Sequence, residues 1–162
     1  MSNYLIPLMV VVPMLCAILV NAFAKFNKSI KVLTFVVAIC LPIIPLLSNY
    51  GLHFFGGYTP MLDNATGVIY HPAITYAFDM LQQIFIAAVG LITFLVAFIY
   101  LSKYKKASGQ YLFLLFMGTA SVTALMLTDD IFNMFVFFEI LALVQVGIVI
   151  ASPMDYSYEM AL

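Results

Sequence analysis

Five long runs of apolar residues, separated by short polar connections, dominate this sequence of 162 residues. They cover residues 4–23, 30–47, 74–101, 111–127 and 131–150. An α-helix rises about 1.5 Å per residue, so roughly 20 apolar residues cross a hydrocarbon core of about 30 Å. Because 65% of the residues are hydrophobic and only 8% are charged, an ordinary soluble domain is excluded. We predict an all-α polytopic membrane protein with about five transmembrane helices, residues 1–162 forming a single membrane domain.

The lysines predict the orientation of these helices. All of them fall in the two connections after the first and third apolar runs: Lys25, Lys28, Lys31, Lys103, Lys105 and Lys106. Cytoplasmic loops are enriched in Lys and Arg, so both connections should face the cytoplasm and the N-terminus should lie outside. The outer segment 48–73 carries Gly and Pro residues among aromatic ones, which predicts turns and short pieces lying against the bilayer surface.

Charge and cysteine content narrow the function classes. The net charge of -1 leaves no basic face, so no nucleic-acid partner is expected. Cys16 and Cys40 stand alone inside apolar runs, which argues against a zinc site or a disulfide framework. The sequence therefore predicts a chain surrounded by the lipid bilayer that holds no metal and no cofactor of its own.

Glu139 is the acidic residue that lies deepest in an apolar run. It follows Asp130 by nine residues, which places it roughly 14 Å into the membrane, close to the midplane. A carboxylate at the bilayer centre costs about 2.5–3.5 kcal/mol on insertion scales, so an acid at this depth indicates a functional site. Burial favours the neutral form of a carboxyl and a nearby cation favours the charged form, so a group balanced between the two can load and release a proton. The alternative is a structural carboxyl hydrogen-bonded to a neighbouring helix.

Two further groups of polar residues lie in the third and fourth runs. Asp79, Gln82 and Gln83 share one helical face because they are three and four residues apart. They either line a polar entrance or cap the helix and join it to a neighbour. Thr119 and Thr123 suit close helix packing, the favoured interpretation, and could also hold water.

Residues 111–150 closely resemble the fourth and fifth helices of the antiporter-like subunits shared by respiratory complex I, Mrp-type cation/proton antiporters and membrane-bound energy-converting hydrogenases. The core of the resemblance is the segment D-I-F-N-M-F-V-F-F-E, from Asp130 to Glu139. In that family the glutamate corresponding to Glu139 is a key charged residue of the proton pathway. The third run, with Asp79 followed by Tyr100 and Tyr104, and the proline-containing first run also look like the family.

The resemblance implies the N-terminal part of an antiporter-like subunit that translocates protons, or exchanges Na⁺ for protons. Its complex would be redox-driven, such as an energy-converting hydrogenase or a complex I-like oxidoreductase. Family members are usually much longer and carry buried lysines on later helices. Here such lysines would come from the rest of a longer chain or from neighbouring membrane subunits.

This chain contains no redox motif, so iron–sulfur clusters and redox metals are expected in partner subunits, including peripheral electron-transfer subunits. The expected location is the plasma membrane of a prokaryote or an inner mitochondrial-type energy-coupling membrane. The alternative function is a non-transporting scaffold or anchor subunit of such a complex, which the absence of lysines from the apolar runs favours. A solute permease has less support because no polar cluster lies near the midplane.

Overall fold

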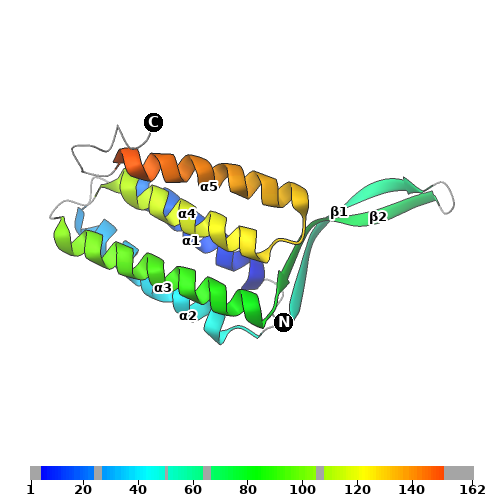
Figure 1. Ribbon diagram of the computed structural model, residues 1–162, viewed down its shortest axis with the longest axis horizontal. Coiled ribbons are helices and arrows are strands. Elements are labelled where there is room, and N and C mark those ends of the chain that lie inside the picture. The colour runs from blue at the N-terminus through cyan, green and yellow to red at the C-terminus, as the bar shows by residue number, and fades with distance from the viewer. Residues whose placement is uncertain (1–4, 24–26, 50, 64–66, 105–107, 152–162) are drawn as a thin grey trace.

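A computed structural model describes residues 5–23, 27–49, 51–63, 67–104 and 108–151. This part of the chain forms five helices and one β-hairpin (Figure 1). In chain order the elements are α1 (Leu5–Ala22), α2 (Asn27–Leu47), β1 (Leu52–Asp63), β2 (Gly67–Phe78), α3 (Met80–Lys103), α4 (Gly109–Leu127) and α5 (Ile131–Ala151). The helical fold class that the apolar runs predict is confirmed.

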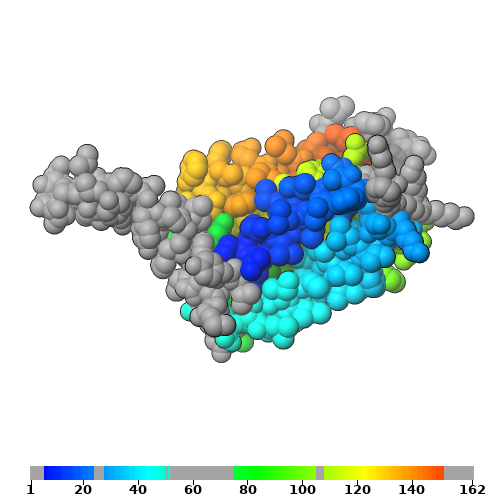
Figure 2. Space-filling view, turned by 180° about the vertical axis from the view of Figure 1, so that it is seen from behind, coloured from blue at the N-terminus to red at the C-terminus, as the bar shows by residue number. Residues whose placement is uncertain are grey.

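The first four helices form a closed ring. The helix α1 packs on α4 and α2, and α3 packs on α2 and α4. The fifth helix is attached to the outside of this ring, with α4 as its main neighbour. Figure 2 shows the reverse face, where α1 lies beside α2 and α5 forms an edge. The helix α5 therefore has far less protein around it than the others.

Four helices are long and apolar enough to cross a membrane, by length and composition: Lys28–Leu47 within α2, and the whole of α3, α4 and α5. The helix α1 contributes a shorter apolar stretch, Ile6–Ala22. The start of α2 and the end of α3 meet at one end of the bundle, where the Lys31 ammonium donates to the Tyr104 carbonyl oxygen at 3.2 Å. The hairpin and the α4–α5 connection lie at the other end (Figure 1). We call these the lysine end and the hairpin end.

The prediction of a turn-rich segment lying on the bilayer surface is wrong. The strands β1 and β2 pair antiparallel from Leu52↔Phe78 to Asp63↔Gly67. The hairpin extends away from the helices, along the general direction of their axes (Figure 1). Both strands of a two-stranded sheet have a free edge, so Pro60 and Pro72 can occupy them without removing a ladder hydrogen bond. Prolines that predict turns are therefore compatible with this ribbon.

The third apolar run begins as a strand, so its predicted helical start at residue 74 is also wrong. Residues 74–78 end β2, and α3 starts only at Met80. Thr75, Tyr76 and Phe78 are β-branched or aromatic residues, which favour strands. Tyr76 and Phe78 are buried in an apolar cluster at the hairpin end. Its other buried members are Ile6, Met9, Val10, Ile86, Ala124 and Leu127. This cluster anchors the base of the hairpin to the ring of helices.

Candidate functional site

Two of the three polar residues in the segment from Asp130 to Glu139 hold the start of α5. The Asp130 carboxylate accepts hydrogen bonds from the backbone N–H groups of Phe132 and Asn133, both at 3.2 Å. This is an N-cap, which satisfies amides that have no partner within the helix. The Asn133 side-chain amide donates to the Thr128 hydroxyl at 3.1 Å and to the Tyr76 hydroxyl at 3.4 Å. Asp130 and Asn133 thus tie α5 to the end of α4 and to β2.

Glu139, the third polar residue, lies on the face of α5 that is turned away from α4. It is exposed, whereas Val144 is the buried residue of this helix. Five residues at about 100° each separate the two side chains by about 140° around the helix axis. No described residue forms a hydrogen bond or an ion pair with the Glu139 carboxyl. Unlike Asp130, it therefore makes no structural bond within the described part of the chain.

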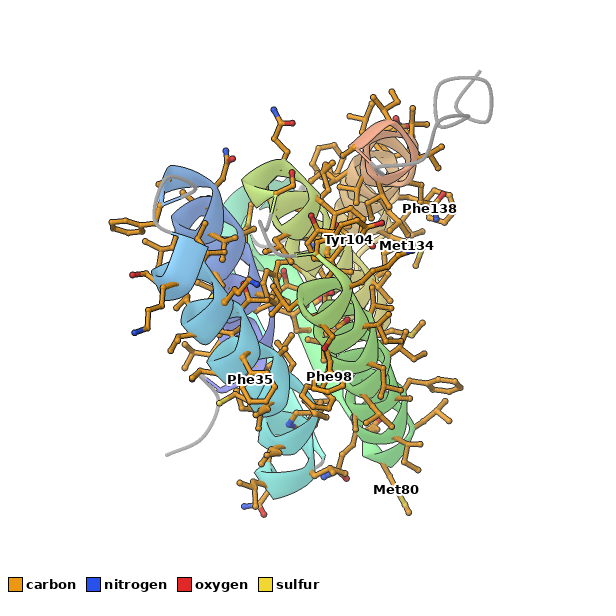
Figure 3. The ribbon with its side chains drawn as sticks, turned by 90° about the vertical axis from the view of Figure 1, so that its left-hand side faces the viewer. Phe35, Met80, Phe98, Tyr104, Met134 and Phe138 are labelled. Carbon is orange, nitrogen blue, oxygen red and sulfur yellow. The ribbon has the colours of Figure 1, made fainter. Side chains whose placement is uncertain are left out.

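The apolar residues around Glu139 are exposed as well. Phe132, Phe135 and Leu143, within seven residues of it, are 74%, 62% and 73% exposed. Phe138 points away from the bundle in Figure 3. Glu139 is the ninth residue of a helix of 21 residues, about 12 Å from its start. A carboxyl thus sits near the middle of a membrane-length helix, in an apolar face that the described helices leave uncovered.

The polar residues that begin α3 make cap and interhelical bonds. The Gln82 Oε1 atom accepts a hydrogen bond from the Asp79 backbone N–H at 3.1 Å. The Gln83 amide donates to the carbonyl oxygens of Pro45 at 2.9 Å and Ser48 at 3.1 Å, at the end of α2. Carbonyls in the last turn of a helix lack an intrahelical donor, so Gln83 satisfies groups that α2 cannot. A polar entrance at Asp79, Gln82 and Gln83 stays a prediction.

Thr119 takes part in a hydroxyl pair that the sequence did not indicate. Its Oγ1 atom on α4 lies 2.9 Å from the Thr93 Oγ1 atom on α3. Each hydroxyl also lies 2.9 Å from the carbonyl oxygen four residues earlier, on Val89 and Leu115. A hydroxyl has one proton, so the two threonines can make only two of these three bonds at a time. The pair borders a groove between α3, α4 and α5 that Gln145 also lines.

A small cavity lies inside the ring of four helices, with a volume of about 10 Å³. That is about the room that one water molecule requires. All four helices contribute to its lining: Met9, Val12, Pro13, Leu41, Ile44, Pro45, Ile86, Gly90, Thr119 and Thr123. Both threonines that the sequence indicated therefore border one cavity.

Two prolines free backbone carbonyls on residues that line this cavity. Pro13 and Pro45 lack an N–H, so the carbonyls four residues earlier, on Met9 and Leu41, have no helical donor. Met9 and Leu41 line the cavity together with Thr123. Thr123 is only 2% exposed, and no described residue hydrogen-bonds its hydroxyl. A buried water needs two to four polar partners, and the threonines Thr119 and Thr123 are the lining residues with polar side chains.

Comparison with known proteins gives a long relative and a structural neighbour. No protein-family model matches the chain. The uncharacterized protein MJ1309 of Methanocaldococcus jannaschii is 36% identical over 160 residues, covering 99% of this chain and 32% of that protein. A chain in the structure of the membrane-bound sulfane sulfur reductase (MBS), an archaeal respiratory membrane complex, matches with a TM-score of 0.77 at 20% identity. That match covers 99% of this chain and 33% of the other. The likeness establishes the fold.

The chain spans about one third of the length of both proteins that it matches. The likeness and the apolar helices together support a multi-pass membrane protein. Membership of the antiporter-like family stays a prediction from the segment Asp130 to Glu139.

Proposed function

We propose that this chain is the N-terminal part of an antiporter-like subunit that moves protons, or exchanges Na⁺ for protons, within a redox-driven membrane complex. Glu139 is the proton-pathway carboxylate in this proposal. The proposal rests on a contrast between the polar side chains of the segment from Asp130 to Glu139. Asp130 and Asn133 have structural bonds, whereas the Glu139 carboxyl lies near mid-membrane with none from the described residues. An acid kept at such a depth without a structural bond is best explained by transport.

Glu139 requires a protein surface from outside the described helices. A carboxylate in contact with lipid hydrocarbon is costly, and an apolar face with one acid at its centre suits a cation-bearing helix. The described lysines, Lys28, Lys31 and Lys103, all lie at the lysine end of the bundle, away from the middle of α5. We therefore place the cation that balances Glu139 on helices of a longer chain or of a neighbouring membrane subunit. The threefold greater length of the relatives supports this placement.

The redox chemistry belongs to partner subunits in this proposal. Iron–sulfur clusters, redox metals and peripheral electron-transfer subunits would supply the driving force, and this chain would supply part of the ion path. The likeness to a chain of the MBS respiratory complex supports such a setting. The complex would work in an energy-coupling membrane, such as the plasma membrane of a prokaryote.

The substitution Glu139→Gln tests the function because it keeps the size and hydrogen bonding of the side chain but cannot ionise. We expect electron transfer to lose its coupling to ion movement in inverted vesicles, while native gels show an intact complex. Asp129→Asn is the matched control, since Asp129 is an exposed acid at the hairpin end. It should leave ion movement unchanged. Equal ion movement in Glu139→Gln and the unmodified complex would contradict the proposal and favour the scaffold.

Asp79→Asn tests the polar entrance separately. If the face with Gln82 and Gln83 admits ions, transport should slow without loss of the complex. The backbone N–H of residue 79 donates the hydrogen bond to the Gln82 side chain, and the substitution does not change this group. The start of α3 should therefore remain intact. An unchanged transport rate would remove the entrance hypothesis and leave these residues as caps.

A further inference from the structure

We propose that a groove between α2 and α3, at the lysine end, binds one anionic membrane lipid. The phosphate of its head group lies against Lys31 and Ser102, and the upper part of one hydrocarbon chain lies along Phe35 and Phe98. This site is separate from the face that carries Glu139, so it does not depend on the proposed ion transport.

The groove has the chemistry of an amphiphile. It is a hollow of about 350 Å³ with a lysine and a serine among its lining residues and apolar side chains otherwise. Its lining consists of Lys31, Val32, Phe35, Val36, Phe98, Leu101 and Ser102. Lys31 and Ser102 belong to the ends of α2 and α3 that lie near the lysine connections. The groove therefore has polar side chains at its rim and apolar side chains further in. This arrangement matches a lipid, whose charged head group lies at the membrane surface above its hydrocarbon chains.

Phe35 and Phe98 form the aromatic wall of this groove, and the Phe94 ring packs against both of them. The Phe35 ring centroid on α2 lies 6.0 Å from that of Phe94 and 6.5 Å from that of Phe98, both on α3. The Phe94 and Phe98 rings are 6.2 Å apart along α3. Figure 3 shows Phe35 and Phe98 side by side on their helices. From Ser102 to Phe98 the helix descends about 6 Å, so the aromatic wall begins just below the level of a head group that is bound at Ser102.

Among the residues that the structure describes, the charged side chains at the lysine end are lysines. Lys28, Lys31 and Lys103 lie there, whereas Asp129 and Asp130 lie at the hairpin end. No ion pair to Lys31 forms within the described ranges, and its partly buried ammonium donates one hydrogen bond, to the Tyr104 carbonyl oxygen. An ammonium has three donors, so two remain for phosphate oxygens. Basic pockets between helices on the cytoplasmic side suit anionic lipid head groups.

Native mass spectrometry of the intact protein tests this site. Phosphatidylglycerol and phosphatidylcholine with identical chains would be added separately, and the fraction of protein retaining one lipid measured. We expect phosphatidylglycerol to be retained preferentially. Lys31→Gln should lower that retention about five-fold, the factor typical of one lysine near an anionic head group. Equal retention of the two lipids would overturn the proposal.

Lys103→Gln is the matched control. It removes a lysine from the same end but from outside the groove, where its ammonium lies 5.5 Å from the centroid of the Tyr104 ring. It should change retention much less than Lys31→Gln, and equal losses would indicate diffuse surface charge instead of a site. Lys31→Arg keeps the charge and should keep the lipid, which guards against a folding defect in Lys31→Gln. Phe98→Ala removes part of the wall and should also reduce retention.

A photo-crosslinking residue at Val36 distinguishes a lipid from a protein occupant. Val36 lines the groove and is 53% exposed. In the native membrane we expect crosslinks to phospholipid. Crosslinks to a polypeptide at this position would show that another helix covers the groove and would overturn the lipid assignment.

Discussion

The hydroxyls of Thr93 and Thr119 face each other at 2.9 Å across the α3–α4 interface. Helix association within a membrane gains little from the hydrophobic effect, so interhelical hydrogen bonds of this kind matter. We expect a double-mutant cycle of Thr93→Val and Thr119→Val to give a coupling energy of about 0.6 kcal/mol in unfolding measured in detergent micelles. Each single variant leaves the other threonine bonded to its own helix, which limits its individual cost. A coupling energy of zero would mean that the hydroxyls bond only to their own carbonyls.

Thr34 and Thr123 are two buried threonines that differ in surroundings. The Thr34 hydroxyl is buried, and no residue in the described part of the chain forms a hydrogen bond with it. Replacing it in Thr34→Val removes an unsatisfied polar group, so we expect stabilisation of about 1 kcal/mol. Thr123→Val should not stabilise, because the Thr123 hydroxyl borders the water-sized cavity. Thermal unfolding of both variants provides the measurement, and equal stabilisation would indicate that the cavity is dry.

Gly90 allows α3 to approach the backbone of α2. A Cβ atom at this position would lie 2.7 Å from the Leu41 carbonyl carbon and from the Pro42 nitrogen. Backbone atoms cannot move aside locally, so Gly90→Ala should destabilise the protein by about 2 kcal/mol. Gly118→Ala is the control, since its nearest neighbour is a side-chain atom of Val144 at 3.1 Å. Similar unfolding temperatures for the two variants would contradict this account of the α2–α3 contact.

Asp130 separates a capping role from an ion-pathway role. Asp130→Ala removes the acceptor for two amides of α5 and should cost about 1 kcal/mol of unfolding free energy. Asp130→Asn keeps an oxygen acceptor, so both stability and ion movement should stay close to those of the unmodified protein. Loss of ion movement in Asp130→Asn, with stability retained, would assign this carboxyl to transport.

Hydropathy was sufficient to predict four of the helical segments closely, because the cost of placing polar backbone in lipid leaves few alternatives to a helix. The hairpin was not predicted, since strand pairing joins residues far apart along the chain and the glycines and prolines of this segment indicated turns. The helical start predicted at residue 74 was wrong for a separate reason. The apolar end of a strand and an apolar helix look alike in hydropathy.

The site was predicted only in part. The depth of Glu139 follows from counting residues, but the face it occupies depends on which side of α5 meets α4. Thr93 was missed because a single threonine in an apolar run carries no signal until its partner is known. The sequence contains Pro13 and Pro45, yet nothing in it shows that both prolines line one cavity.

The helix α5 touches the rest of the bundle along one main line of contact, its packing on α4. A helix that packs mainly on one neighbour can rotate about that contact. Each helix of the ring packs on two ring neighbours and cannot rotate without disturbing both. Rotation of α5 would sweep Glu139 through an arc while the cavity and the Thr93–Thr119 pair stay in place. Of the five helices, α5 is the one whose described contacts lie mainly along a single neighbour, and spin-label distances between α5 and α2 would show whether it turns about that contact.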